Sequence, residues 1–360
     1  MLMTFVMTTT RSETLLLCLS YTHLSKSNFG SALSAAPRNP SVTCSPRLMR
    51  AAWLLPLACL TIRVPLVSAS KPILVVGATG KVGQLVVKQL SLSGQSVRAL
   101  ARDPDSDTAA ALASLTGVDV VQGDVLDRAA MESAVTGCSV VISVSGASRK
   151  SSLEDLIGVP PPIFRTDLAF DQAHPQQVNY VGLVNTIGAM QGAGLSRIVR
   201  LTGLSCSFSA FNPFVMLIGC GLLSMSTAWH SRSENLLRES TLDYTILRPG
   251  GLSDDARGTN TLSAASRTLP LAQGRIGRAD LAALAIEAAC GKGGKRATVA
   301  CGWAKEGEGA DSWAPLLEAI PSDEGPLPLE PYRLAVGLLL GGVLGVTLLV
   351  ETTFAKVLFG

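Results

Sequence analysis

Residues 77–83 read GATGKVG, and they stand between a short apolar run and an amphipathic one. The first glycine of this spacing permits a tight turn, the second lets the backbone approach a diphosphate, and the third lets a helix pack on the preceding strand. The helix N-terminus adds unpaired amide N–H groups and a positive dipole end. The spacing therefore predicts a dinucleotide site formed by Gly77, Thr79, Gly80, Lys81, Val82 and Gly83. The alternative is a turn with only a structural role.

The end of the next predicted strand bears on which dinucleotide would bind. An acidic residue at this point would bind the adenosine ribose hydroxyls and select NAD. This sequence has Arg102, followed by Asp103. A planar guanidinium suits a 2′-phosphate, so Arg102 favours NADP, with NAD as the alternative because Asp103 is so close. A solvated loop cation is the purely structural interpretation of Arg102.

Small and acidic residues at later strand ends extend the predicted site. Asp124 and Val125 follow the third strand, where Asp124 either accepts a hydrogen bond from the adenine amino group or caps the next helix. Asp127 is the better placed cap. Small residues at the end of the fourth strand would let a ring and ribose lie against the backbone. The further cofactor-binding candidates are Asp124, Val125, Ser145, Gly146, Pro249 and Gly250.

From Lys71 onwards, short apolar runs alternate with longer helical patterns. This alternation is typical of α/β folds with a doubly wound parallel sheet. Predicted strands are 73–76, 96–101, 119–122, 139–144, 197–201, 244–247 and 297–301, and predicted helices are 82–92, 128–135, 175–193, 227–240 and 279–290. Residues 147–175 are expected to form an irregular insertion over the cofactor cleft. The sequence thus predicts a Rossmann domain over residues 71–305.

These motifs resemble the atypical short-chain dehydrogenase/reductases of the NmrA-like, NAD(P)H-binding type, including plastid members. The resemblance covers residues 71–301 and is carried by GATGKVG at 77–83, VRALARDP at 97–104, GDV at 123–125, VNYVGLVN at 178–185, RIVRLTGLS at 197–205, LDYTILRPGGL at 242–252 and RIGRADLA at 275–282. It implies a Rossmann fold and a pyridine dinucleotide. It does not identify a substrate.

Active members of the wider short-chain dehydrogenase/reductase superfamily use a Tyr-x-x-x-Lys pair, in which the lysine holds the nicotinamide ribose and lowers the pKa of the tyrosine for proton exchange. Here Ser226 stands in the tyrosine position and His230 in the lysine position, and the strand-end serine position falls near Thr202 or Gly203. The usual proton-transfer route is therefore absent. The catalytic candidates that remain are His230 and Tyr180. His230 could bond the ribose or act as an acid and base with its reference pKa of about 6.5, and Tyr180 alternatively packs beneath the cofactor. Arg248 is expected to be a structural pairing residue.

The N-terminal segment 1–70 has the composition of a targeting sequence. It contains six basic residues and one acidic residue, and it is rich in Ser, Thr, Ala and Leu, as in organelle transit peptides. A secretory signal starting at Met49 is a second interpretation, and a disordered extension is the third. We expect a chloroplast protein with its Rossmann domain in the stroma; mitochondrion and endoplasmic reticulum are the alternatives.

The C-terminal segment predicts a membrane anchor. Residues 334–350 form an uncharged run of 17 residues after a proline-rich linker, 306–331. At about 1.5 Å per residue the run is about 25 Å long, near the short limit for a bilayer crossing. We therefore expect a single transmembrane helix over residues 332–352, with glycines at four-residue spacing that suit a helix partner. A buried helix is the alternative. Residues 209–225 are also unusually apolar, and either core packing or a lipid or substrate surface explains them.

Charge and cysteine usage exclude some functions. Because the first 70 residues carry a net charge of +5 and the whole chain carries +3, the remainder carries −2. A slightly negative body lacks the cationic surface that nucleic acid binding needs. The eight cysteines show no metal-ligand spacing, so no metal site is expected.

Two functions fit these observations, and a third fits less well. The first is a membrane-anchored NADP-dependent oxidoreductase acting on a hydrophobic small molecule. The second is a non-catalytic NADP(H)-binding redox sensor, or an assembly scaffold for a membrane protein complex. The third, a structural membrane protein without nucleotide, conflicts with the intact glycine motif.

Overall fold

The computed structural model describes residues 70–147, 171–217, 225–270, 273–305 and 307–332, a few positions of the helix that follows, and the backbone of two short N-terminal strands. The chain divides into two units, Met1–Ser68 and Ala69–Gly360. In the first unit, β1 (Val6–Thr9) pairs antiparallel with β2 (Leu15–Cys18). The predicted targeting function of residues 1–70 otherwise lies outside the described residues, as does most of the predicted insertion at 147–175.

The second unit is built on an eight-stranded sheet with the order β10-β12-β8-β7-β6-β3-β4-β5. Its strands are β3 (Ile73–Val76), β4 (Val97–Ala101), β5 (Val118–Gln122), β6 (Val140–Ser143), β7 (Arg197–Leu201), β8 (Asp243–Pro249), β10 (Leu262–Ser266) and β12 (Ala297–Trp303). Neighbouring strands are parallel except β10, which runs antiparallel to β12. The order reverses between β3 and β6, so the predicted doubly wound Rossmann sheet is confirmed.

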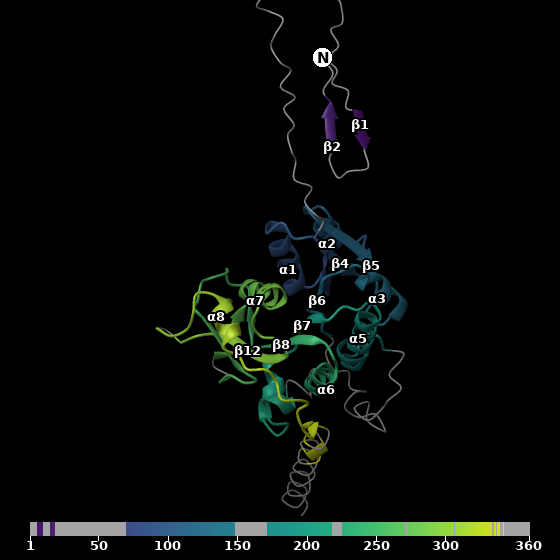
Figure 1. Ribbon diagram of the computed structural model, residues 1–360. Helices are drawn as coiled ribbons and strands as arrows, with labels where there is room; N and C mark the ends of the chain where they lie inside the picture. The colour runs from purple at the N-terminus through teal and green to yellow at the C-terminus, as the bar shows by residue number, and fades with distance from the viewer. Residues whose placement is uncertain are drawn as a thin grey trace, which may run out of the picture. The chain divides into compact units, whose positions relative to one another are not determined.

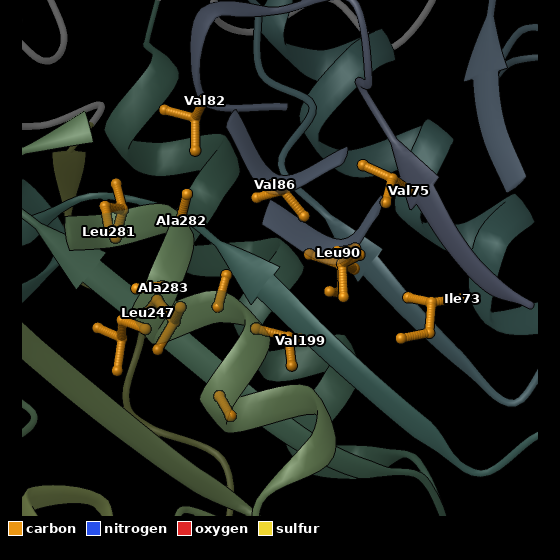
Figure 2. Packing of buried hydrophobic residues seen from close by; sticks show 14 of the residues in the cluster. Ile73, Val75, Val82, Val86, Leu90, Val199, Leu247, Leu281, Ala282 and Ala283 are labelled. Atoms are coloured by element: carbon orange, nitrogen blue, oxygen red, sulfur yellow. The ribbon is translucent and has the colours of Figure 1, made fainter. Parts of the chain in front are cut away.

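Helices cover both faces of this sheet (Figure 1). They are α1 (Lys81–Leu92), α2 (Asp107–Ala113), α3 (Arg128–Val135), α5 (Gly182–Gly192), α6 (Ser226–Glu239), α7 (Arg278–Cys290) and α8 (Trp313–Glu318). One core joins α1 and α7 to β3, β7 and β8, and Figure 2 shows Val86 and Leu281 among its side chains. A second core on the other face contains Met131, Leu183 and Leu237 from α3, α5 and α6.

Short elements lie between these helices and strands. A π-helix, η3 (Gln176–Val181), leads into α5, and a 3-10 helix, η4 (Leu204–Ser207), follows β7. Strands β9 (Leu252–Ser253) and β11 (Ile276–Gly277) form a small parallel pair. The ends of the long strands and helices were predicted within one or two residues. The short α2, α8 and β10 were missed, because they are too short, or too rich in Ala and Ser, to show a hydrophobic periodicity.

The prediction of a linker over residues 306–331 was wrong for much of that segment. It contains α8, whose Trp313 and Leu317 are buried in the first core. The Asp323 carboxylate accepts hydrogen bonds from Tyr244 and Thr298, and its side chain is 1% exposed. The segment therefore packs on the Rossmann domain, because its apolar and acidic side chains have partners that only the folded sheet supplies.

The segment after the prolines begins as a helix beside α6. Tyr332 and Ala335 are buried in a cluster with Trp229 and Val215, and the Tyr332 hydroxyl lies 3.1 Å from Ser231 Oγ. Within the residues that the structure describes, no helix is long and apolar enough to cross a membrane. Nearly all of the predicted transmembrane segment, 332–352, lies outside those residues.

Candidate functional site: a dinucleotide cleft

A cleft of about 510 Å³ opens at the carboxyl ends of β3, β4, β5 and β6. This edge, where the strand order reverses, is where doubly wound sheets bind ligands. The lining includes eight of the predicted cofactor residues: Gly77, Thr79, Gly80, Arg102, Asp124, Val125, Ser145 and Gly146. Residues 172, 173 and 178 line the cleft as well. The lining thus comes from five segments that are far apart in sequence, namely 76–80, 100–102, 123–125, 144–147 and 172–178.

The glycine motif forms the tight turn between β3 and α1. Gly77 has a φ of +85°, and a Cβ there would lie 2.8 Å from the Ser145 backbone. A Cβ on Gly83 would lie 2.1 Å from the Gly77 carbonyl oxygen, so Gly83 serves the packing of α1 on the turn. Gly80 is exposed, and no side chain caps α1. The amide groups of the first helical turn therefore remain available to a phosphate, and these residues fit a dinucleotide.

The other residues of the motif divide between the cleft and the core. Thr79 lines the cleft, and its carbonyl oxygen accepts a 2.9 Å hydrogen bond from Gln84. Lys81 is exposed at the start of α1, whereas Val82 is buried beneath the turn. Lys81, Val82 and Gly83 are not among the side chains that line the cleft, so they shape the loop rather than its surface.

Arg102 and Asp103 differ in orientation. Arg102 is exposed and lines the cleft. The Asp103 carboxylate accepts a 3.0 Å hydrogen bond from the Asp105 amide within its own turn, and Asp103 does not line the cleft. The guanidinium is therefore the charged group at the end of β4 that faces the site.

Asp127, not Asp124, caps α3. The Asp127 carboxylate accepts a 3.1 Å hydrogen bond from the Ala130 amide. Asp124 accepts a 2.9 Å hydrogen bond from the Leu126 amide and lines the cleft beside Val125. The capping alternative for Asp124 was therefore wrong, and its carboxylate stays at the cleft.

Asn179 was missed from the sequence, although it ties the cleft wall to α6. It lies in the π-helix η3 and is fully buried. Its Oδ1 accepts a 2.9 Å hydrogen bond from the Ala147 amide, which fixes the orientation of the side-chain amide. Its Nδ2 then faces Ser226 Oγ at 3.3 Å and His230 Nε2 at 3.2 Å. Asn179 thus contacts the residues in both positions of the missing Tyr and Lys, a relation that no local pattern reveals.

His230 is held as a neutral imidazole. Because Asn179 donates to Nε2, the ring proton belongs on Nδ1, which is buried without a hydrogen-bond partner. Burial, with the nearby charge of Arg200, lowers the pKa of His230 to about 3. This direction is opposite to the near-neutral titration that the reference pKa suggests, because the sequence does not reveal burial, and a catalytic role for His230 stays a prediction.

Three other candidates do not line the cleft. The Tyr180 ring packs against Trp229, with ring centroids 5.9 Å apart, in the cluster that contains Tyr332. Gly250 packs against Gly274, whose carbonyl oxygen accepts its amide hydrogen bond at 2.8 Å, and Pro249 pairs with β12. None of these three residues lines this cleft, and the expected positions of Tyr180 beneath the cofactor and of Pro249 and Gly250 at its end stay predictions.

A buried ion cluster lies under the second half of the sheet. Glu234 is fully buried and accepts hydrogen bonds from Arg248, Arg238 and Thr202. Burial acts to raise the pKa of Glu234, but the charge of Arg248 and its hydrogen bonds outweigh this effect and hold the pKa below its usual range. Arg248 is a pairing residue, as the sequence predicted. The Thr202 hydroxyl donates to Glu234 at 2.8 Å, so its proton is already engaged.

Comparison with known proteins agrees with this geometry. The model of a family described as NAD(P)H-binding matches residues 77–290. The chain belongs to this NAD(P)H-binding family. Curated proteins similar to this chain include a chloroplastic protein and a reductase, and the atypical short-chain dehydrogenase/reductase resemblance predicted from the motifs is confirmed.

Two curated relatives are informative. An uncharacterized chloroplastic protein of Arabidopsis thaliana is 30% identical over 60% of this chain and 64% of its own length. Sanguinarine reductase of Eschscholzia californica is 29% identical over 60% of this chain and 83% of its own length. This chain therefore spans less than two thirds of the first relative.

Among solved structures, an NAD-dependent epimerase/dehydratase-like protein from Bacillus halodurans superposes with a TM-score of 0.52 at 19% identity. The match covers 69% of this chain and 99% of that protein. At this identity the likeness establishes the shared fold alone.

Proposed function

We propose that this chain binds NADP(H) in the cleft and works as a membrane-anchored oxidoreductase on a hydrophobic small molecule in the chloroplast. The observation that carries the proposal is the cleft itself, in which the glycine turn, the uncapped end of α1 and Arg102 meet. The relatives support its other parts, since one is chloroplastic and another is named as a reductase.

The preference for NADP over NAD rests on the end of β4. Arg102 is exposed at the cleft, where its guanidinium has room to form paired hydrogen bonds with a 2′-phosphate. The carboxylate that would favour NAD, Asp103, is hydrogen-bonded within its own turn. The charge facing this part of the cleft is thus positive.

The chemistry that fits this site is hydride transfer governed by position. The bound nicotinamide supplies or accepts the hydride, and the chain holds the reactants at the strand ends, an arrangement that by itself lowers reaction barriers. The wall at Ser145–Ala147 is fixed by Asn179 and Arg200. His230 is a neutral hydrogen-bonding group, and the Thr202 proton is committed to Glu234. The proton that completes a reduction therefore comes from solvent or from the substrate.

The membrane part of the proposal rests on the C-terminal run and an exposed apolar surface. Residues 334–350 carry no charge. Four apolar side chains are between 43% and 59% exposed, three of them in segment 211–217 and one near the start of this run; they are Phe211, Phe214, Leu217 and Leu338. Buried neighbours from these two regions, Val215 and Ala335, belong to one cluster. A bilayer would cover the apolar groups that water now contacts.

A second candidate is favoured by the same lack of a proton donor. Ser226 and His230 occupy the catalytic positions, and neither supplies the tyrosine and lysine chemistry. The chain would then be a non-catalytic NADP(H)-binding redox sensor or scaffold in a membrane complex. Steady-state NADPH oxidation by membrane extracts containing the full chain separates the two: turnover supports the oxidoreductase, and tight binding without turnover on any candidate substrate supports the sensor.

Cofactor binding is tested by calorimetric titration of the full chain, in detergent micelles, with NADPH and NADH. We expect both to bind and NADPH to bind more tightly. No heat of binding with either dinucleotide would refute the whole proposal, and equal affinities would refute the NADP assignment alone.

Anchoring is tested by flotation of the full chain with lipid vesicles. A double variant, Gly341→Arg with Val346→Arg, puts two charges into the apolar run, each costing about 2.5–3.5 kcal/mol at a bilayer centre. We expect wild type to float and the double variant to remain in solution. Leu92→Arg is the matched control, because Leu92 is an exposed apolar residue at the end of α1 and its replacement should leave flotation unchanged. A double variant that floats like wild type excludes the anchor.

A further inference from the structure

Arg200 is a buried cation directly behind the wall of the cleft. It lies on β7 and is 1% exposed. Its Nη1 donates to Ser143 Oγ at 2.8 Å, to the Ser145 carbonyl oxygen at 2.9 Å and to Ser145 Oγ at 3.1 Å. Ser145 itself lines the cleft. A full positive charge therefore lies one residue behind the cleft surface.

No carboxylate among the described residues pairs with this guanidinium. Its Nε and Nη2 are buried without hydrogen-bond partners. Glu234 is near enough to act on Arg200 electrostatically, but its oxygens already accept hydrogen bonds from Arg248, Arg238 and Thr202.

Within the described part of the chain, the charges of the surrounding ion cluster also leave the Arg200 guanidinium without a compensating carboxylate. Its four guanidinium groups and two carboxylates belong to Arg200, Arg238, Arg248 and Arg267 and to Glu234 and Asp323. The cluster keeps an excess of positive charge, and Arg200 is its member in contact with the cleft wall. The adjacent His230, as a neutral ring that accepts from Asn179, adds no charge to this field.

The affected half of the site is the one that would hold the nicotinamide. In a doubly wound fold the dinucleotide crosses the switch point, with adenosine over the first half of the sheet and the second nucleotide over the other half. Arg102 and Asp124 follow β4 and β5 in the first half, whereas Ser145 follows β6 in the second. The Arg200 charge therefore acts on the nicotinamide side.

We propose that Arg200 makes the cleft select the reduced dinucleotide, NADPH, over NADP⁺. This inference rests on the proposed NADP(H) site. The two forms carry the same phosphates and differ by the unit positive charge of the oxidised nicotinamide ring. Between two unit positive charges separated by about 10 Å at an effective dielectric constant of about 20, the repulsion corresponds to about tenfold in affinity, and this sets the size of the expected preference. The protein would then bind NADPH in preference to NADP⁺. Bound NADPH suits both proposed functions, since it can donate hydride in an oxidoreductase and indicates the reduced state of the cofactor in a sensor.

The test compares dissociation constants for NADPH and NADP⁺ measured by titration of the full chain in detergent micelles. For wild type we expect NADPH to bind about tenfold more tightly. Arg200→Gln keeps donors for Ser143 and Ser145 but removes the charge, so NADP⁺ should gain affinity and the ratio should approach one. Arg200→Lys keeps the charge and should keep the preference.

Each result is decisive. Equal wild-type affinities overturn the inference even if Arg200→Gln fails to fold, and an unchanged ratio in a folded Arg200→Gln variant overturns it as well. Failure of wild type to bind either NADPH or NADP⁺ is a different outcome, because it refutes the proposed site and not only its charge selectivity.

Discussion

The two halves of the sheet's carboxyl edge are built differently. The first half, after β3, β4 and β5, uses backbone turns, the exposed Arg102 and the half-buried Asp124. The second half, after β6, β7 and β8, uses buried polar side chains that bond to one another, among them Asn179, Arg200 and Glu234. The first half contains the glycine motif of a dinucleotide site, whereas the second has Ser226 and His230 in the positions of the superfamily's Tyr and Lys. The two halves should therefore respond differently to substitution.

The largest expected effect is in the second half, at Glu234. Glu234→Gln leaves Arg248 and Arg238 buried with a weakened partner, and breaking a buried ion pair costs about 4 kcal/mol of unfolding free energy. Chemical denaturation of the full chain measures the loss. Glu132→Gln is the control, since its ion pair with Arg128 is exposed and should contribute under about 1 kcal/mol. Similar losses for both variants would contradict the contrast between a buried and an exposed pair.

The next effect distinguishes two glycines of the first half. Gly83→Ala would place a Cβ 2.1 Å from the Gly77 carbonyl oxygen, and such overpacking should cost about 3 kcal/mol. In Gly80→Ala the nearest atom would be 3.3 Å away, so the fold should survive while NADPH binding weakens at the cleft surface. Thermal unfolding and NADPH titration of both variants measure the difference. A Gly83→Ala protein as stable as Gly80→Ala would refute the packing role.

A smaller, pH-dependent effect is expected at His230. Its folded pKa, about 3, lies below the usual value of 6.5, so below pH 6.5 the unfolded chain binds a proton that the native ring does not. Stability should therefore fall as the pH decreases from 6.5 towards 3, by about 2 kcal/mol between pH 6.5 and 5.

His230→Gln should remove this contribution to the change of unfolding free energy with pH. The glutamine side-chain oxygen can accept the Asn179 hydrogen bond, but the glutamine does not titrate. Denaturation of both proteins at several pH values provides the measurement. Parallel stability curves for wild type and variant across this range would show that the imidazole titrates in the folded state as it does in the unfolded chain.

The smallest effect sharpens the description of the first half. Arg102→Ala should weaken NADPH binding about tenfold, equivalent to about 1.4 kcal/mol, with NADH little changed. Arg128→Ala is a matched control, since Arg128 is an exposed arginine on α3 outside the cleft lining. Calorimetry with both dinucleotides gives the result, and an equal loss of NADPH and NADH affinity would contradict a contact between Arg102 and the 2′-phosphate.

Local sequence was enough to predict the first half of the edge and the sheet behind it. Glycine spacing, strand periods and the position of Arg102 are local, because the turn, the helix start and the strand end all lie close together along the chain. The Rossmann fold and the NAD(P)H-binding family could therefore be predicted before any coordinates. The short α2, α8 and β10 could not, because their residues carry little period of their own.

The second half depends on contacts that form only when the chain folds. Asn179 reaches Ala147 and His230 across 32 and 51 positions of the chain, and Asp323 binds Tyr244 across 79. Whether a histidine titrates near neutrality, or an arginine lacks a carboxylate partner, depends on burial and on neighbours that folding brings together. The residue types are written in the sequence, but their charges at the cleft are set by packing.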